Sequence, residues 1–443
     1  MSHGYAKTRE QVSFIETSGS VANKSTLSFN HAQSNSTPGI LAQTIENSFV
    51  KNAPTISSDY IVEKIPTIIK DSALGSTGAN GEDKLCCCEL SNGNICVVYS
   101  VSTSLFFTIY QQSDWTAAVS ETTIASGGTD LSNMTVRAMG DEFVVAWEDG
   151  GVIAIEIFSN AGVSQHGPST PTSGNTACDE LDIAVYPDNS GFILVYEGTS
   201  QDLYYEVFDS NLSSQSWAEA NNAATVAGLC CTILEDETLV IGYNDVSTFK
   251  VRTYDASNKS SLSAGVSDTS IEASQAAGTK YSMLPINSDS FVFVGASGGG
   301  DLVIFYYKIS GSSIYDCGRS SIDGGVGDRT VRCMAWNDLN HALTFQDIAG
   351  WSATGILYGK GQPIKGGGNF TLGMPAGDFD GYGCVTGASG GCFFITYRNL
   401  ADDKPYFFVM RAMHCQIEID DSNNVTLTNY MGETLTFKLT YTG

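Results

Sequence analysis

The stretch LCCCELSNGNICVVYS (residues 85–100) joins two apolar runs through a polar tight turn, and its second run ends near an aromatic residue. Two short apolar runs around a polar turn are typical of a β-hairpin. The same pattern returns six more times, as MTVRAMGDEFVVAWED (134–149), IAVYPDNSGFILVYEG (183–198), LCCTILEDETLVIGYND (229–245), YSMLPINSDSFVFVGAS (281–297), VRCMAWNDLNHALTFQD (331–347) and YGCVTGASGGCFFITYRN (382–399).

One position in the second run measures the period of this repeat. Equivalent places are spaced by 47 to 53 residues and are aromatic in every copy but the fifth, at Tyr99, Trp147, Tyr196, Tyr243, Ala296, Phe345 and Tyr397. Repetition at this period indicates a propeller or a solenoid, in which one unit cannot bury its own apolar faces.

Each unit continues with a third run rich in β-branched and aromatic residues, such as LFFTIY (105–110), and in most units with a weaker fourth segment. Four antiparallel strands in each of seven units predict an all-β fold, a seven-bladed β-propeller. The chain resembles the β-propeller superfamily as a whole over residues 76–420, without the signature motifs of its sialidase-type, WD40 or kelch branches. A β-solenoid is a weaker alternative, because its coils are usually much shorter.

Cysteines gather on the predicted first strands, which line the crowded axis of a propeller. There they act as small apolar side chains. They lack the spacing of a disulfide framework and form no CxxC pair, so reduced thiols and no zinc site are expected. They are Cys86, Cys87, Cys88, Cys230, Cys231, Cys333 and Cys384.

Charge divides the chain into parts. Asp and Glu number 48 against 22 Lys and Arg, a net charge of −26, yet residues 1–75 are neutral. We therefore predict a polar N-terminal arm (1–75), the propeller (76–420) and a C-terminal β-hairpin (421–443). An acidic body argues against nucleic acid and anionic lipid partners, both of which need Lys and Arg. No apolar run is long enough to cross a membrane, and the first 30 residues lack the apolar core of a secretory signal.

The arm holds two segments that look structured. STPGILAQTIENSFV (36–50) has a capping Thr37 and places Ile40, Leu41, Ile45 and Phe49 roughly on one helical face. This predicted helix either packs on the flank of the propeller or docks the chain onto a larger assembly. YIVEKIPTIIK (60–70) reads as a strand interrupted at Pro66, and one option is that it pairs with the last blade and closes the ring.

The tail QIEIDDSNNVTLTNYMGETLTFKLTYTG (416–443) alternates apolar and polar residues, which predicts three half-buried strands. The first is a candidate outer strand for the last blade. The other two are predicted to form a hairpin around residues 431–432, which either covers the ring joint or offers an edge to another subunit.

Signals for catalysis are weak. GASGG occurs at residues 295–299 and 387–391, but in strand–turn–strand settings without the following helix of a nucleophile elbow. The five histidines have no metal-ligand spacing, and GDFDGYG (377–383) lacks the distal acid of a calcium loop. No catalytic residue, metal or cofactor is expected.

Three tryptophans in polar loops are the candidate ligand contacts: Trp115, Trp217 and Trp351. Tryptophan in such a loop stacks on a sugar ring or anchors an interface. For Trp115 and Trp217 the alternative, an apolar anchor for the outer strand, is favoured because Trp is highly buried on average. Trp351 is the better ligand candidate.

An arm joined to a head without catalytic motifs is similar in organisation to virion spike, fibre and tail proteins that carry a propeller. That resemblance implies a non-enzymatic virion protein, assembled in a host cytoplasm, that docks on other structural proteins by its arm and contacts a cell-surface glycan or protein receptor. The alternatives are a lectin-like or scaffold propeller in the cytoplasm or at a cell surface, and a polysaccharide-active enzyme.

Overall fold

A computed structural model describes residues 10–17, 23–28, 43–46, 60–74, 85–128, 131–172, 175–176, 178–221, 226–245, 248–273, 281–296, 302–321, 331–336, 341–348, 351–358, 365–371, 379–380, 384–389, 392–399, 404–419, 424–429 and 435–442. The chain divides into two compact units, one of Met1–Thr67 with Arg411–Gly443 and one of Ile68–Met410. Apart from the 3-10 turn η1 (Thr199–Gln201), the regular structure of the described residues is β-strand. Among them no helix has the length and apolarity to span a membrane.

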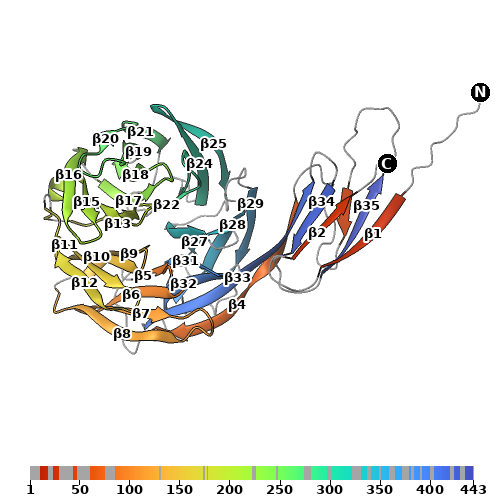
Figure 1. Ribbon diagram of the computed structural model, residues 1–443, viewed down its shortest axis with the longest axis horizontal. Coiled ribbons are helices and arrows are strands. Elements are labelled where there is room, and N and C mark those ends of the chain that lie inside the picture. The colour runs from red at the N-terminus through yellow and green to blue at the C-terminus, as the bar shows by residue number, and fades with distance from the viewer. Residues whose placement is uncertain are drawn as a thin grey trace, which may run out of the picture. The chain divides into compact units, whose positions relative to one another are not determined.

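The unit Ile68–Met410 is built from antiparallel sheets that follow one another along the chain (Figure 1). The first sheet contains β5 (Leu85–Glu89), β6 (Ile95–Val101), β7 (Ser104–Tyr110) and β8 (Ala117–Ser126). The second contains β9 (Leu131–Met139), β10 (Glu142–Asp149), β11 (Val152–Ser159) and β12 (Ser164–Ser169). The third contains β13 (Leu181–Val185), β14 (Gly191–Glu197), β15 (Leu203–Asp209) and β16 (Ser214–Asn221).

Three further sheets continue this order. The fourth contains β17 (Val226–Ile233), β18 (Thr238–Asp245), β19 (Thr248–Asp255), β20 (Ser263–Ala264) and β21 (Thr269–Ala273). The fifth contains β22 (Ser282–Pro285), β23 (Ser290–Ala296), β24 (Leu302–Ser310) and β25 (Ser313–Ser321). The sixth contains β26 (Val331–Trp336), β27 (His341–Ile348), β28 (Trp351–Tyr358) and β29 (Lys365–Thr371).

The last sheet joins the two ends of this unit. It contains β31 (Val385–Ala388), β32 (Cys392–Asn399), β33 (Lys404–Ile419) and, beside β33, the early strand β4 (Tyr60–Ala73); β30 (Phe379–Asp380) also pairs with β32. The amide of Leu74 donates to the carbonyl of Pro405 at 2.8 Å. The expected pairing of residues 60–70 with the last blade is confirmed, but the strand runs on through Pro66 without interruption.

The first strands of these sheets form a closed cycle. β5, β9, β13, β17, β22, β26 and β31 contact one another in that order, and β31 contacts β5. The predicted all-β propeller is thereby confirmed as the fold class. The number of blades, seven, remains a prediction. The described residues of this unit form seven sheets, which is consistent with it.

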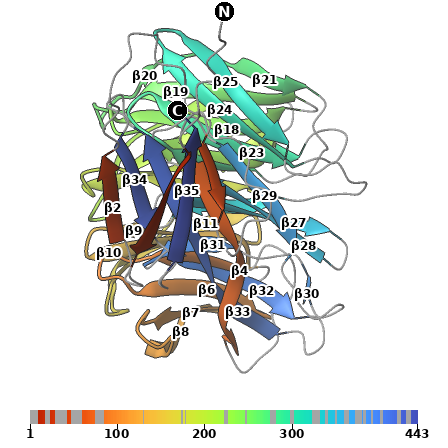
Figure 2. The same ribbon diagram turned by 90° about the vertical axis from the view of Figure 1, so that its right-hand side faces the viewer.

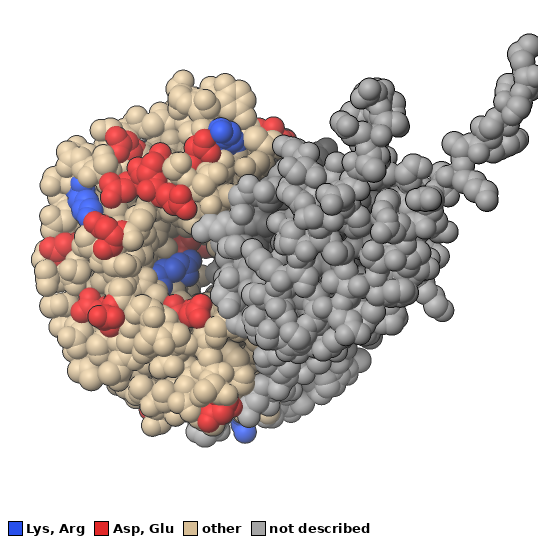
Figure 3. Space-filling model, turned by 45° about the vertical axis from the view of Figure 1, so that its right-hand side comes forward, with Lys and Arg blue, Asp and Glu red and all other residues tan. Residues whose placement is uncertain are grey.

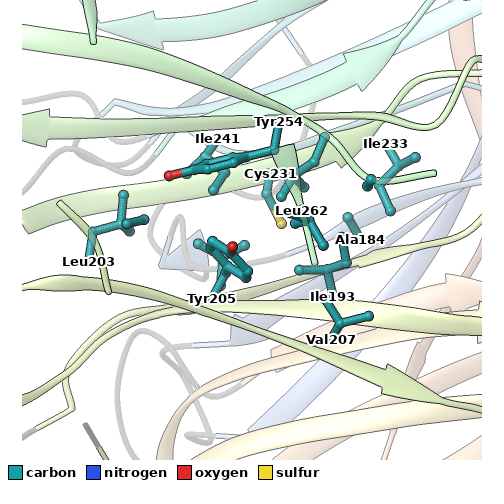
Figure 4. Packing of buried hydrophobic residues seen from close by; sticks show 14 of the residues in the cluster. Ala184, Ile193, Leu203, Tyr205, Val207, Cys231, Ile233, Ile241, Tyr254 and Leu262 are labelled. Carbon is teal, nitrogen blue, oxygen red and sulfur yellow. The ribbon is translucent and has the colours of Figure 1, made fainter. Parts of the chain in front are cut away.

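Apolar side chains fill the space between neighbouring sheets. β14 is buried along its whole length, and its Ile193 packs with Tyr205 of β15 and Cys231 of the next sheet (Figure 4). Each fully buried aliphatic or aromatic side chain of this kind contributes roughly 1.5–3 kcal/mol. Because the strands are buried on both faces, the second runs read as continuous apolar segments.

The structure explains why the position that marks the repeat is aromatic in two of the units. Tyr99 and Tyr243 are buried, and each hydroxyl donates to a carboxylate further along the same unit: Tyr99 to Glu121 at 2.5 Å and Tyr243 to Asp268 at 2.8 Å. Burying the ring requires a partner for the hydroxyl, and the acid supplies it. Burial and the nearby acid raise the pKa of both phenols.

The other unit pairs strands from both ends of the chain. β1 (Glu10–Thr17) and β3 (Gln43–Glu46) flank β35 (Leu435–Thr442), while β2 (Asn23–Ser28) pairs with β34 (Asn424–Asn429), which pairs with β33. Figure 2 shows β2 and β34 side by side. The boundaries therefore differ from the predicted 1–75, 76–420 and 421–443, because segments from both ends share one unit.

Two local predictions in this unit are wrong. A helix was expected across residues 36–50, but residues 43–46 are strand β3, paired with β35. A helix of that length is marginal alone, and pairing with a strand decided the outcome. The C-terminal hairpin was expected between the last two strands. Instead β34 forms its hairpin with β33, and β35 pairs with β1 and β3, since an isolated two-stranded hairpin is marginally stable.

Candidate functional site

A cavity among the described residues lies at the axis of the propeller. It has a volume of about 390 Å³ and is lined by the first strands β5, β9, β13, β17, β22 and β31. Three of its lining residues are charged, namely Arg137, Glu180 and Asp182. The first strands reach this axis because each sheet presents its inner edge there, so the wall carries both apolar side chains and backbone groups.

An ion pair crosses from one sheet to the next in this wall. Nη2 of Arg137, on β9, donates to Oδ1 of Asp182, on β13, at 2.7 Å. Thr135 of β9 also donates its hydroxyl to this oxygen, at 3.4 Å. The other oxygen, Oδ2, accepts the backbone amide of Cys231 on β17 at 2.9 Å. Asp182 therefore joins the second, third and fourth sheets at the axis.

The Arg137 side chain keeps 39% of its surface exposed, whereas that of Asp182 keeps 13%. The guanidinium therefore faces the cavity while its carboxylate partner is held in the wall. The Asp182 carboxylate raises the pKa of Arg137, against the effect of burial. The Arg137 guanidinium is therefore positively charged, and it is held at the cavity by a charge-assisted hydrogen bond to the Asp182 carboxylate.

The cysteines of the first strands line this cavity or pack behind it. Cys86, Cys87, Cys88, Cys231 and Cys384 line it, and no cysteine with a described side chain forms a disulfide bond. Burial raises the pKa of Cys88 to about 12 and that of Cys86 and Cys231 well above the ordinary value. Such thiols stay protonated at neutral pH, so they behave as the small apolar residues that the sequence predicts. Among described side chains, no group of three His, Cys, Asp or Glu could hold a metal ion.

The second GASGG motif lies at the joint between the last sheet and the first. Gly387 and Ala388 end β31, and Ser389 follows in a turn. The hydroxyl and the amide of Ser389 both donate to Oε1 of Gln112, at 2.5 and 2.8 Å. The side-chain amide nitrogen Nε2 of Gln112 in turn donates to Oε1 of Glu89 at 2.7 Å. The serine is therefore part of a polar seam across the ring closure. Most of the first GASGG motif lies outside the described residues.

The predicted ligand tryptophans lie in different surroundings. Trp115 is half-buried against Phe394 of β32, with ring centroids 5.9 Å apart, which matches the anchor interpretation. Trp217 lies on the outer strand β16 and keeps 48% of its surface exposed, which does not match it. Trp351 begins β28, but its side chain lies outside the described residues. Trp115 and Trp217, the two with described side chains, belong to different sheets, the first and the third.

The predicted docking residues cannot be compared in the same way. Ile45 lies in β3, where its backbone pairs with Leu439. Ile40, Leu41 and Phe49 lie outside the described residues.

Sequence reasoning missed Arg137 and Asp182. Both are lone charged residues inside apolar first strands, MTVRAM and LDIAV. A charge in such a strand is costly unless it is paired, so two of them in neighbouring repeats were a usable signal.

No family model matches the chain, and no curated protein matches it either. Solved structures are similar to it in fold. A lectin, BP39L from Burkholderia pseudomallei, has a TM-score of 0.55 at 12% identity, covering 76% of this chain and 96% of the lectin. A streptogramin B lyase has a TM-score of 0.51 at 10% identity, covering 80% and 97%. The WD40 domain of Toxoplasma gondii coronin has 0.50 at 10%, covering 81% and 87%. At these identities the likeness shows the β-propeller fold alone.

Proposed function

We propose that this chain is a non-enzymatic binding and structural protein, a component of a virus or phage particle that attaches through its terminal segments and contacts a host receptor or a neighbouring subunit with its propeller. The observation that carries the proposal is the division of the chain. The segments Met1–Thr67 and Arg411–Gly443 form a compact unit of their own, apart from Ile68–Met410. An attachment unit and a recognition unit are what such a role requires.

Strand pairing supports the attachment role. β1 and β3 are held by β35, and β2 is held by β34, so the N-terminal segment is tied to the C-terminal segment by backbone hydrogen bonds. Among the described strands, β1, β3 and β2 are the outer members of these pairings, and outer strands can offer backbone groups to a partner. A neighbouring structural protein that adds a strand there is the partner we propose for this unit.

Exposed aromatic side chains support the recognition role. Trp217 on β16 and Tyr315 on β25 keep 48% and 53% of their surfaces exposed. Large aromatic side chains are enriched at protein interfaces and stack on sugar rings. The partner we propose for one or both of these side chains is a cell-surface glycan or protein.

The first prediction tests the particle role by location. Antibodies against the purified propeller are applied to particles made by the source of this chain and are imaged by immunogold electron microscopy. We expect gold on the outside of intact particles. With a chain that lacks residues 1–57, which removes β1, β2 and β3, we expect the protein to be absent from the particles. Continued incorporation of the truncated chain would reject the attachment role.

A lectin-like propeller that acts alone is the second candidate, and exposed Trp217 favours it. Its test is a glycan array with the wild-type protein and the Trp217→Ala variant, using Trp115→Ala as the control for a half-buried tryptophan. Glycan binding that Trp217→Ala abolishes, while removal of residues 1–57 leaves it unchanged, supports this candidate. An array without any bound glycan rejects it.

A further inference from the structure

The axial cavity has the size and the wall of a small-molecule site. Its volume of about 390 Å³ falls within the roughly 300–1,000 Å³ that such sites occupy. Most of its lining residues are apolar, and the charged ones are Arg137, Glu180 and Asp182. The cavity opens to solvent, so a ligand can enter it. A mainly apolar wall with a few polar groups is typical of a site for a small organic molecule.

Arg137 brings hydrogen-bond donors to this cavity that the described residues do not use. A guanidinium group has five N–H groups. Among the described residues, one of them donates to Asp182 at 2.7 Å and another to the backbone carbonyl of Val136 at 3.1 Å. The other three have no partner there. Because the side chain keeps 39% of its surface exposed, these groups are open to a ligand.

Asp182 is not open in the same way. Its oxygen Oδ1 accepts hydrogen bonds from the side chains of Arg137 and Thr135 and from the amide of Ile183, and Oδ2 accepts one from the amide of Cys231. The carboxylate of the ion pair is therefore occupied by the protein, whereas the guanidinium is only partly occupied. A ligand at this pair meets a charged donor, and the group that binds a charged donor best is an anion.

The surrounding charge favours an anion with a single negative charge. Glu180 is also part of the lining, and Figure 3 shows acidic side chains spread over the described face with few basic ones among them. A phosphate group carries about −1.5 to −2 charges at pH 7, so these acids repel it more strongly than a carboxylate. The planar guanidinium also matches the geometry of a carboxylate.

We propose that the axial cavity binds a sugar residue that carries one carboxylate, and that this carboxylate accepts hydrogen bonds from Arg137. The hydroxyl groups of a sugar suit the rest of the wall. Among the described strands, each first strand pairs on one side only, so its other edge offers backbone N–H and C=O groups at the axis. This inference rests on the proposed recognition of a cell-surface glycan. It names an acidic sugar as the ligand and the axis, instead of Trp217, as the site.

The experiment titrates the full chain with D-glucuronate, D-galacturonate and N-acetylneuraminate, and with the neutral carboxamide of each, by saturation-transfer NMR at pH 7. The test variant Arg137→Lys keeps a cation beside Asp182 but removes N–H groups that the carboxylate uses. The control Arg252→Lys makes the same change in a pair outside the cavity lining, where Arg252 donates to Asp268 at 2.8 Å.

We expect at least one of the acids to bind, and its carboxamide to bind about tenfold more weakly. We expect Arg137→Lys to weaken binding of that acid about tenfold, the size of one charge-assisted hydrogen bond, and the control to weaken it less than about twofold. No binding of any of the three acids, equal binding of an acid and its carboxamide, or equal weakening by the two variants would overturn the proposal. Circular dichroism checks folding. If Arg137→Lys does not fold, Arg137→Met with Asp182→Asn, which removes both charges of the pair, takes its place, and retained binding there would overturn the proposal.

The outcome separates this inference from the proposed function. A glycan whose binding depends on Trp217 and not on Arg137 rejects the axial site and leaves the recognition role in place. An acidic sugar that binds through Arg137, in a chain that immunogold labelling does not find on particles, supports the axial site and rejects the particle role.

Discussion

At the scale of single residues, the axis of the propeller depends on Asp182. One carboxylate accepts hydrogen bonds from side chains of β9 and from the backbone of β17, so three sheets share it. Each of those sheets packs against the next through apolar side chains, which have no direction of their own. The directional bonds of Asp182 fix how the inner strands meet.

We expect Asp182→Asn to lower the free energy of unfolding by about 2 kcal/mol, because it removes a hydrogen-bonded counter-charge from Arg137. Urea unfolding followed by tryptophan fluorescence measures this. Asp188→Asn is the matched control. Asp188 pairs with Lys259 at 3.4 Å, but its side chain is 53% exposed, so its loss should change stability by less than about 0.5 kcal/mol. Similar losses in both variants would contradict the role of Asp182.

Glu197 makes stability depend on pH in a direction opposite to that of a salt-bridged acid. Its pKa in the folded chain is about 8 against an ordinary 4.5, so the folded state keeps a proton that the unfolded state releases. Stability from this group is present at low pH and is lost as the pH rises from about 4.5 to 8. We expect Glu197→Gln to become progressively more stable than wild type across that window, by on the order of 5 kcal/mol at pH 9. Parallel urea-unfolding stabilities at every pH would contradict this.

At the scale of elements, the repeats could be predicted because each carries its own signal. An apolar run, a polar turn and a second run specify a hairpin locally, and every described unit contains it. The terminal segments lack such a signal. The alternation of apolar and polar residues in LTFKLTYT predicts strand β35, but it does not indicate that β1 and β3 pair with this strand. The helix expected at residues 36–50 failed for the same reason. The role of Asp182 could not be predicted in this way, because its hydrogen-bond partners lie on other repeats, 45 and 49 residues away in the chain.

The pairing of β4 with β33 should control the stability of the ring. We expect a chain that starts at residue 75 to melt at a clearly lower temperature than one that starts at residue 58. Both lack β1, β2 and β3, but only the shorter chain lacks β4 and exposes the edge of β33. Differential scanning calorimetry and size-exclusion chromatography compare them. Equal melting temperatures, with both chains monomeric, would show that β4 is not needed for closure.

At the scale of the whole molecule, the sheets of the propeller follow chain order until the last one, where the early strand β4 pairs with the late strand β33. Six sheets are built in sequence, and the last combines the late strands β30, β31, β32 and β33 with the early strand β4, so the propeller is complete only when both its ends are made. The same strands, β4 and β33, contribute residues to both compact units. This is why we assign attachment to the terminal segments as a pair and recognition to the propeller.

An electron-microscopy map of the intact chain tests this architecture most directly, with an antibody fragment bound to increase the size of the particle that is imaged. It should contain seven sheets around one axis, with residues 60–73 as the outer strand of the last sheet beside residues 404–419. A ring of six or eight sheets, or a last sheet whose outer strand comes from the C-terminal tail, would contradict it.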